Sequence, residues 1–148
     1  MLFRSKFDIP IILEMGKQMH DTTSYENTDW CPLKVAELCI NLINQPYMQA
    51  WIAESNGEPV GMFFGIIQEQ YFGNTLKAND LLLYVLPEHR GGSHAYKMIQ
   101  KYIQWSESCG VDREQICLGI TTEVNEDAID KFYVRMGFKR SGRIYKLE

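Results

Sequence analysis

The chain has 148 residues, of which 45% are hydrophobic and 23% are charged. This is an ordinary globular composition, so it excludes a disordered, collagen-like or coiled-coil protein. Fifteen Lys and Arg stand against nineteen Asp and Glu, a net charge of −4, which does not favour binding to nucleic acid or to an anionic membrane. The length and the absence of a linker predict a single domain over residues 1–148.

The beginning of the chain does not resemble a targeting signal, because charged residues and Pro10 interrupt its short apolar run. We therefore expect a cytoplasmic protein. The four cysteines have no C-x-x-C spacing, so we expect them to be reduced and mostly buried; they are Cys31, Cys39, Cys109 and Cys117.

Two helices are predicted first. Asp8 is a candidate cap for a helix over Ile9 to Met19, and the polar, aperiodic residues 20–29 predict a loop. Pro32 can open a second helix, which Pro46 ends.

The spacing of the apolar residues then changes from that of helices to that of strands. Met48 to Glu54 and Val60 to Ile67 are apolar runs around Asn56-Gly57, a dipeptide typical of a tight hairpin turn. A polar loop follows over residues 73–77. The nearly all-apolar run Leu81 to Leu86 predicts a strand that is covered on both faces.

The second half alternates helices and strands. Helices are predicted over Ser93 to Cys109 and Asn125 to Met136, each followed by a glycine. Residues 115–120 predict a buried strand, and residues 138–147 a last strand or pair of strands. The fold class is therefore α/β (mixed α+β), with helices around a central sheet.

The segment between the central strand and the long helix carries a candidate anion site. Arg90-Gly91-Gly92-Ser93 leads directly into the helix, whose first N–H groups are unpaired and whose N-terminus is partly positive. Glycines let a phosphate approach the backbone, and Arg90 adds a full charge. A capped turn without a ligand is the alternative. The segment is neither a Walker A loop nor G-x-G-x-x-G.

This segment resembles motif A of the GNAT superfamily of N-acetyltransferases. Arg90 and Ala95 match the ends of the family signature, while Ser93 stands at its usual middle glycine, with Gly92 one residue earlier. Downstream, Asn125-x-x-Ala128 and Phe132-Tyr133-x-x-x-Gly137-Phe138 resemble motif B. The resemblance covers nearly the whole chain and implies a strongly twisted central mixed sheet with helices on both faces.

The resemblance also implies acetyl-coenzyme A as the co-substrate and no metal. The pyrophosphate would rest on the backbone of the phosphate loop, and the pantetheine arm along the central strand, where a backbone N–H polarises the thioester carbonyl. The coenzyme-binding residues so implied are Leu83, Tyr84, Val85, Arg90, Gly91, Gly92, Ser93, His94, Ala95, Asn125 and Tyr133.

Tyr133 is the implied general acid, because a phenol with a pKa of about 10 is protonated at neutral pH and can donate to a departing thiolate. Packing of its ring is the alternative. Asp80 is the candidate general base, with Glu69, Glu123, His20 or ordered water as alternatives. His89 and His94 lack the partners that a metal site would need.

We expect the N-terminal part to select the acceptor, with His20, Tyr25 and Glu69 as substrate-binding candidates beside the loop of residues 68–77. Asp21, Glu26, Asp29 and Glu69 predict an acidic cleft for a cationic amine, unless they form only a solvated loop.

The predicted function is transfer of an acetyl group from acetyl-coenzyme A to a primary amine of a small molecule, peptide or protein. One alternative is a coenzyme-binding module without catalysis. Another is a toxin-like acetyltransferase acting on aminoacyl-tRNA, against which the acidic composition argues. A homodimer is compatible with the resemblance.

Overall fold

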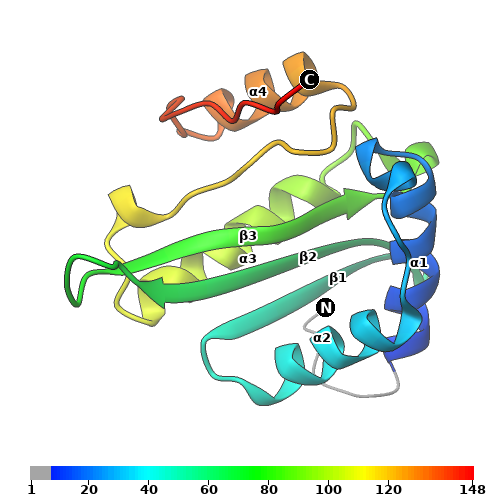
Figure 1. Ribbon diagram of the computed structural model, residues 1–148, viewed down its shortest axis with the longest axis horizontal. Coiled ribbons are helices and arrows are strands. Elements are labelled where there is room, and N and C mark those ends of the chain that lie inside the picture. The colour runs from blue at the N-terminus through cyan, green and yellow to red at the C-terminus, as the bar shows by residue number, and fades with distance from the viewer. Residues whose placement is uncertain (1–7) are drawn as a thin grey trace.

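A computed structural model describes residues 8–148, so the expectation about the first residues lies largely outside the described range. Figure 1 shows a central sheet with helices around it. The elements in chain order are α1 (Ile9–Asp21), η2 (Ser24–Asn27), α2 (Pro32–Asn44), β1 (Met48–Ser55), β2 (Glu58–Glu69), β3 (Leu76–Val85), η3 (Pro87–His89), α3 (His94–Ser108), η4 (Arg113–Gln115) and α4 (Glu126–Arg135).

The sheet has three antiparallel strands in the order β1-β2-β3. The predicted hairpin is present: Asn56 and Gly57 both have positive φ, as the tight turn between β1 and β2 requires. Strand β3 stands at one edge of this sheet and leads through η3 into the long helix α3.

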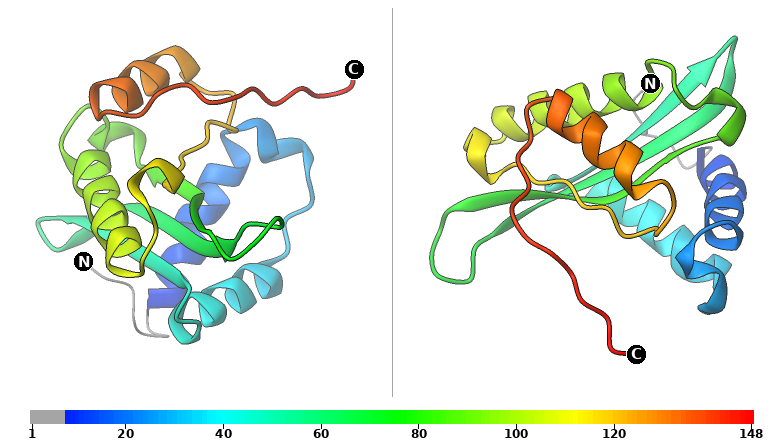
Figure 2. Two further views of the ribbon diagram at one scale, coloured as in Figure 1. Left: turned by 90° about the vertical axis from the view of Figure 1, so that its left-hand side faces the viewer. Right: turned by 90° about the horizontal axis from the view of Figure 1, so that it is seen from above.

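Helices cover both faces of the sheet, and the mixed α/β fold is as predicted (Figure 2). On one face, α3 and α4 pack through a core that includes Phe63, Tyr102 and Tyr133. On the other face, α1 and α2 pack through a core that includes Ile12 and Phe64. The alternation of side chains along β2 separates these two cores.

Two predicted strands are wrong. Residues 115–120 contribute only one parallel bridge, Ala78 to Ile116, beside which the Cys117 N–H donates to the Ala78 carbonyl at 2.9 Å. Further along, the Gly119 N–H donates to Oδ1 of Asp80 at 2.8 Å, so a side chain has replaced the backbone acceptor. The ladder therefore ends where this segment leaves β3.

Residues 138–148 form no strand either. They run beside α4 and then away from the sheet (Figure 2), and residues 139–148 are exposed. Phe138 packs against the core beside Tyr133, and the exposed residues after it make charged contacts: Arg140 donates to Asp130 at 2.7 Å, and Lys146 pairs with Glu123. The segment meets no strand edge in the described chain, so its alternating pattern has no ladder to join.

Three smaller expectations also need correction. Asp8 is at the N-cap position of α1, but its backbone is helical and its side chain caps no N–H group. Helix α1 continues to Asp21, and η2 lies within the expected loop. Strand β3 begins at Leu76 rather than Leu81; its side chains pack in both cores, as predicted, although Leu81 is 46% exposed.

The cysteines are free, but the expectation that they are mostly buried is wrong. Cys39 is buried, Cys31 and Cys117 are half-buried, and Cys109 is exposed at the end of α3. Within residues 8–148, no helix has the length and apolar character needed to cross a membrane.

Candidate active site

A cavity of about 810 Å³ opens beside β3, within the size range of small-molecule sites. Its walls come from both halves of the chain: α1, η2, α2 and β3, then the loop before α3, residues 119–125 and α4. Most of the predicted site residues line it. These are His20, Tyr25, Asp80, Leu83, Tyr84, Val85, Arg90, Gly91, Gly92, Ala95, Asn125 and Tyr133.

The loop before α3 has the features of an anion site. Gly91 has φ +82°, a left-handed conformation that a side chain would strain. Ser93 is the N-cap of α3, but its side chain makes no capping hydrogen bond. The first N–H groups of α3 are therefore not satisfied by that side chain and can bind a negatively charged group. Ser93 and His94 themselves do not line the cavity.

Arg90 connects this loop to the end of β3. Its Nε donates to the Val85 carbonyl at 2.8 Å, and its guanidinium lies 5.5 Å from the centre of the Tyr84 ring. The remaining guanidinium N–H groups keep the planar geometry that suits phosphate oxygens. This contact holds the positive charge at the mouth of the cavity, between β3 and α3.

A β-bulge in β3 separates the functional side chains. Phe64 pairs with Leu82 and Gly65 pairs with Asp80, which leaves Leu81 as the extra residue. The side chain of Asp80 therefore lies on the α3 face, whereas that of Tyr84 packs on the α1–α2 face. From Leu81 to Val85, the outer edge of β3 has no neighbouring strand in the described chain, so its backbone groups face the cavity.

Asp80 and Tyr133 meet at Gly119. The carboxylate accepts from the Gly119 N–H at 2.8 Å, and the Tyr133 hydroxyl donates to the Gly119 carbonyl at 3.4 Å. Burial raises the pKa of Asp80 to about 6, although the bond from Gly119 acts in the opposite direction. Burial also raises the pKa of Tyr133, and the neighbouring carboxylate raises it further. At neutral pH this pair holds one proton acceptor and one proton donor.

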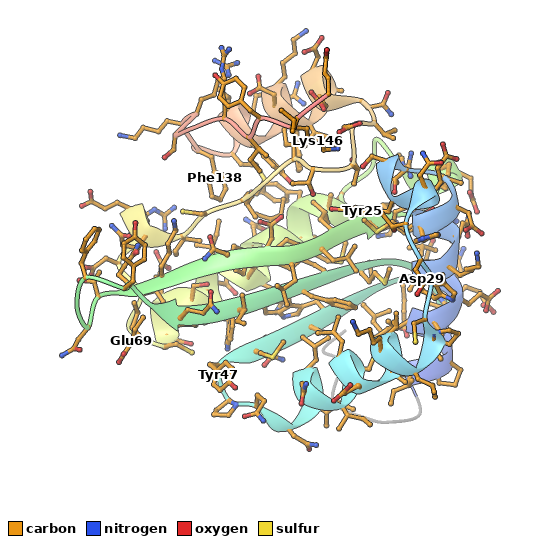
Figure 3. The ribbon with its side chains drawn as sticks, in the orientation of Figure 1. Tyr25, Asp29, Tyr47, Glu69, Phe138 and Lys146 are labelled. Carbon is orange, nitrogen blue, oxygen red and sulfur yellow. The ribbon has the colours of Figure 1, made fainter. Side chains whose placement is uncertain are left out.

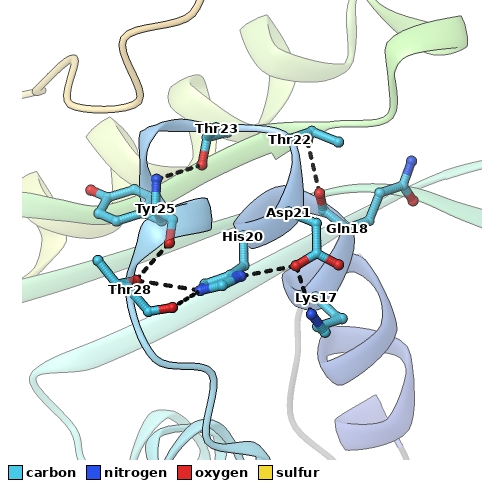
Figure 4. A network of polar contacts seen from close by, with 8 residues as sticks. All are labelled: Lys17, Gln18, His20, Asp21, Thr22, Thr23, Tyr25 and Thr28. Atoms are coloured by element: carbon cyan, nitrogen blue, oxygen red, sulfur yellow. Dashed lines mark hydrogen bonds and ion pairs between the residues drawn. The ribbon is translucent and has the colours of Figure 1, made fainter.

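His20, from α1, and Tyr25, from η2, also line the cavity. The His20 ring nitrogens lie 2.9 Å from the Thr28 carbonyl oxygen and 3.0 Å from Oδ1 of Asp21, so both are already engaged (Figure 4). The Tyr25 hydroxyl and Oγ1 of Thr121 are 2.8 Å apart. His20 therefore has a fixed ring, and Tyr25 joins η2 to the segment that follows Gly119.

The expected acidic cleft is not formed. Glu69 lies at the end of β2, far from Tyr25 (Figure 3), and it does not line the cavity. Asp21, Glu26 and Asp29 are exposed and also lie outside the lining. Asp21 contacts Lys17 and His20, and the bond from Lys17, followed by that from His20, lowers its pKa. Within residues 8–148, Asp80 is the only carboxylate in the lining.

Several lining residues were not predicted from the sequence, among them Trp30, Phe64 and Thr121. Thr121 follows the segment expected to be a strand, and a polar residue just after such a segment is a usable signal. Trp30 and Phe64 carry no such signal, because an apolar side chain in a cavity cannot be told from one in a core by its spacing. Within the described residues, no group of three or more His, Cys, Asp or Glu could hold a metal ion.

Comparison with known proteins identifies the family. Residues 46–140 match the acetyltransferase (GNAT) domain family, which is more than half of the chain, so this chain belongs to the GNAT acetyltransferases. It is accordingly an acyltransferase. No curated protein gives a significant match.

Solved structures share the fold at low sequence identity. A predicted acetyltransferase with acetyl-CoA from Clostridium acetobutylicum is 18% identical, with a TM-score of 0.76 over 97% of this chain and 92% of the other. A ribosomal-protein-alanine N-acetyltransferase from Brucella melitensis biovar Abortus 2308 is 16% identical, with a TM-score of 0.71 over 100% and 96%. An aminoglycoside acetyltransferase from an uncultured soil metagenomic sample, in complex with sisomicin, is 16% identical, with a TM-score of 0.69 over 97% and 92%.

Proposed function

We propose that this chain, as one domain, transfers the acetyl group of acetyl-coenzyme A to a primary amine by direct attack. The observation that carries the proposal is one cavity lined by the anion-binding loop, the open edge of β3 and the Asp80–Tyr133 pair. Acetyl-coenzyme A supplies the activated acetyl group as a thioester. It also requires a site for its phosphates and an extended channel for its pantetheine arm.

The described residues fit these requirements. Arg90, Gly91 and the N-terminus of α3 supply positive charge and N–H groups for the pyrophosphate. The open edge of β3 from Leu81 to Val85 offers backbone donors and acceptors to the pantetheine amides and one N–H to the thioester carbonyl. Asn125, in the left-handed conformation before α4, lines the same cavity.

Asp80 and Tyr133 divide the proton transfers between them. A bond forms between the amine nitrogen and the acetyl carbon, and the bond between that carbon and sulfur breaks. Asp80 accepts the proton that the amine loses, since its raised pKa makes it a stronger base than an ordinary carboxylate. Tyr133 donates a proton to the thiolate that leaves, and its raised pKa keeps it protonated until then. Charge and protons balance across the pair.

Titration with acetyl-coenzyme A tests this proposal, with coenzyme A and ATP beside it. A ligand that binds only the folded state stabilises it by about 2.7 kcal/mol at a hundredfold excess over Kd. We expect both coenzyme forms to raise the melting temperature and to release heat on binding, with no effect of ATP. Thiol release on adding a mixture of primary amines then reports transfer. Binding without release would favour the non-catalytic module, and no binding by a folded sample would contradict the proposal.

A further inference from the structure

One part of the cavity lies between the sheet and the first two helices. We call it the α1–α2 compartment, and its lining includes Ile12, Met19, Leu38, Met62, Phe64 and Tyr84. Most of these side chains belong to the core on the α1–α2 face of the sheet. The compartment is therefore apolar, and it lies across β3 from the face that carries Asp80.

Charge excludes one class of acceptor from this compartment. The only carboxylate in the described lining is Asp80, which is on the other face, whereas Arg90 and Arg135 are also in the lining. An acceptor with a second ammonium group would have to bury that charge against apolar side chains or near a guanidinium. Burial of an unpaired charge costs far more than burial of a methyl group.

Tyr84 points to a hydrogen-bonding group on the ligand. Its side chain is only 4% exposed, and within residues 8–148 no group hydrogen-bonds its hydroxyl. A buried hydroxyl without a partner is destabilising, and native proteins rarely keep one without a reason. Because the hydroxyl itself is buried, a bound molecule with a hydroxyl or carbonyl group would satisfy it once a neighbouring side chain moves aside.

The compartment is closed on one side by contacts between distant parts of the chain. The Ser24 N–H donates to the Thr122 carbonyl at 3.0 Å, and its Oγ donates to the Thr121 carbonyl at 3.0 Å. The Tyr25 hydroxyl also lies within hydrogen-bond distance of Oγ1 of Thr121 (Tyr25 in Figure 3). Tyr25, Thr121 and Thr122 line the cavity, so this bridge limits the size of the acceptor that can enter beside η2.

We propose that the acceptor is a small primary amine with an apolar, uncharged body and a single hydrogen-bonding group that meets Tyr84. This inference rests on the proposed acetyl transfer and names its substrate class. It replaces the expectation of an acidic cleft for a cationic amine, which rested on acidic residues that do not reach the cavity.

Three amines of equal length test the charge requirement. Heptylamine, aminohexanol and hexamethylenediamine have the same number of heavy atoms and differ only in a terminal methyl, hydroxyl or ammonium group. Thiol release from acetyl-coenzyme A gives kcat/KM for each. We expect the diamine to be at least about tenfold poorer than heptylamine, because its second charge must be buried. Equal or better use of the diamine would overturn the inference while leaving the proposed transfer intact.

Binding separates failure of catalysis from failure of the inference. Calorimetry with the protein saturated with coenzyme A measures amine affinity without turnover. Tighter binding of heptylamine than of the diamine, with no thiol release from either, would support the acceptor class and contradict the transfer. The absence of binding by all three amines would overturn the acceptor class.

Two variants test the residues. Leu38→Glu puts a carboxylate into the compartment and should improve use of the diamine relative to heptylamine; Leu33→Glu, on the exposed side of the same helix, should change neither. Tyr84→Phe should lower kcat/KM for aminohexanol about two- to tenfold more than that for heptylamine, the usual effect of one hydrogen bond. An equal effect of Tyr84→Phe on both amines, or none, would remove Tyr84 from acceptor recognition.

Discussion

The backbone of Gly119 brings two ionisable side chains together. Its N–H donates to Asp80, and its carbonyl accepts from the Tyr133 hydroxyl. Replacing Asp80 with Asn keeps an oxygen for the Gly119 N–H but removes the base. We expect kcat/KM to fall by about a hundredfold or more. In the wild type, activity should decrease as pH falls through about 6, the pKa of Asp80.

Initial rates between pH 5 and 9 measure this effect, with the pH range chosen around the Asp80 pKa of about 6. Asp112→Asn, at an exposed position before η4, is the matched control and should keep the wild-type profile. An acid limb that survives in Asp80→Asn would assign the base to another group.

Stability should depend on the same carboxyl. Because folding raises the pKa of Asp80 from about 3.8 to about 6, its favourable contribution is complete below the lower value and is lost as pH rises through the upper one. Relative to wild type, the free energy of unfolding of Asp80→Asn should therefore be higher at pH 7 than at pH 4. Urea titrations of both proteins at the two pH values measure this difference; a difference that is independent of pH would contradict the raised pKa.

Tyr133→Phe separates proton donation from packing. The Tyr133 ring lies 5.9 Å from that of Phe132 and 6.1 Å from that of Phe138, contacts that Phe can keep. If the hydroxyl protonates the leaving thiolate, turnover should fall at least about tenfold while the Kd for acetyl-coenzyme A stays within about twofold. Stopped-flow thiol release and calorimetry give the two values. Unchanged turnover would assign Tyr133 to packing alone.

At the scale of elements, the loop before α3 depends on the conformation of one glycine. Gly91 has φ +82°, whereas Gly92 does not have a positive φ, and a Cβ there would make only an ordinary contact, 3.8 Å from the His89 carbonyl oxygen. Gly91→Ala should therefore cost about 1–2 kcal/mol of loop strain, which corresponds to about a five- to thirtyfold loss of coenzyme affinity if the loop relaxes. Calorimetry with coenzyme A measures this loss. Gly92→Ala is the control, and an equal loss in both variants would mean that the loop conformation does not set affinity.

The sequence predicted the elements that local signals define. Pro32, the Asn56-Gly57 turn and the glycines after the two later helices mark their ends directly, and these boundaries agree with the structure within a few residues. Residues 115–120 and 138–147 are predicted strands, but a strand also needs an edge to pair with. The Asp80 side chain accepts the hydrogen bond of the Gly119 N–H, a contact between residues far apart in the sequence that no local pattern predicts.

At the scale of the whole molecule, the family could be predicted because each of its two motifs is a short run of residues in the sequence, and the structure puts residues of both in the lining of one cavity. The acceptor side could not. Asp21, Glu26, Asp29 and Glu69 are close to the expected cleft in sequence, yet the turn into η2 and the length of β2 carry them away from it. The bulge at Leu81 also shifts side-chain alternation within β3, so a simple period of two would have put Asp80 and Tyr84 on the same face.

The bridge between η2 and residues 121–122 joins parts of the chain about a hundred residues apart, and it should couple them energetically. The Tyr25 hydroxyl and Oγ1 of Thr121 are 2.8 Å apart at an exposed position. A double-mutant cycle with Tyr25→Phe and Thr121→Val should give a coupling of about 0.5 kcal/mol in unfolding free energy, the low end for a hydrogen bond. Urea denaturation of the four proteins measures it, and additive effects would mean that the contact is not formed in solution.

The extra residue in β3 has a further consequence for how such a protein could change its chemistry. Leu81 separates Asp80, the proposed base, from the side chains proposed to meet the acceptor, and it lies between two regular pairs, Gly65–Asp80 and Phe64–Leu82. Deleting it would join these pairs into one regular ladder and would leave Asp80 opposite Gly65 on the α3 face. The proposed base and the acceptor compartment would then still lie on opposite faces, so a change of substrate class would need a new side chain in the compartment and not a shift of register.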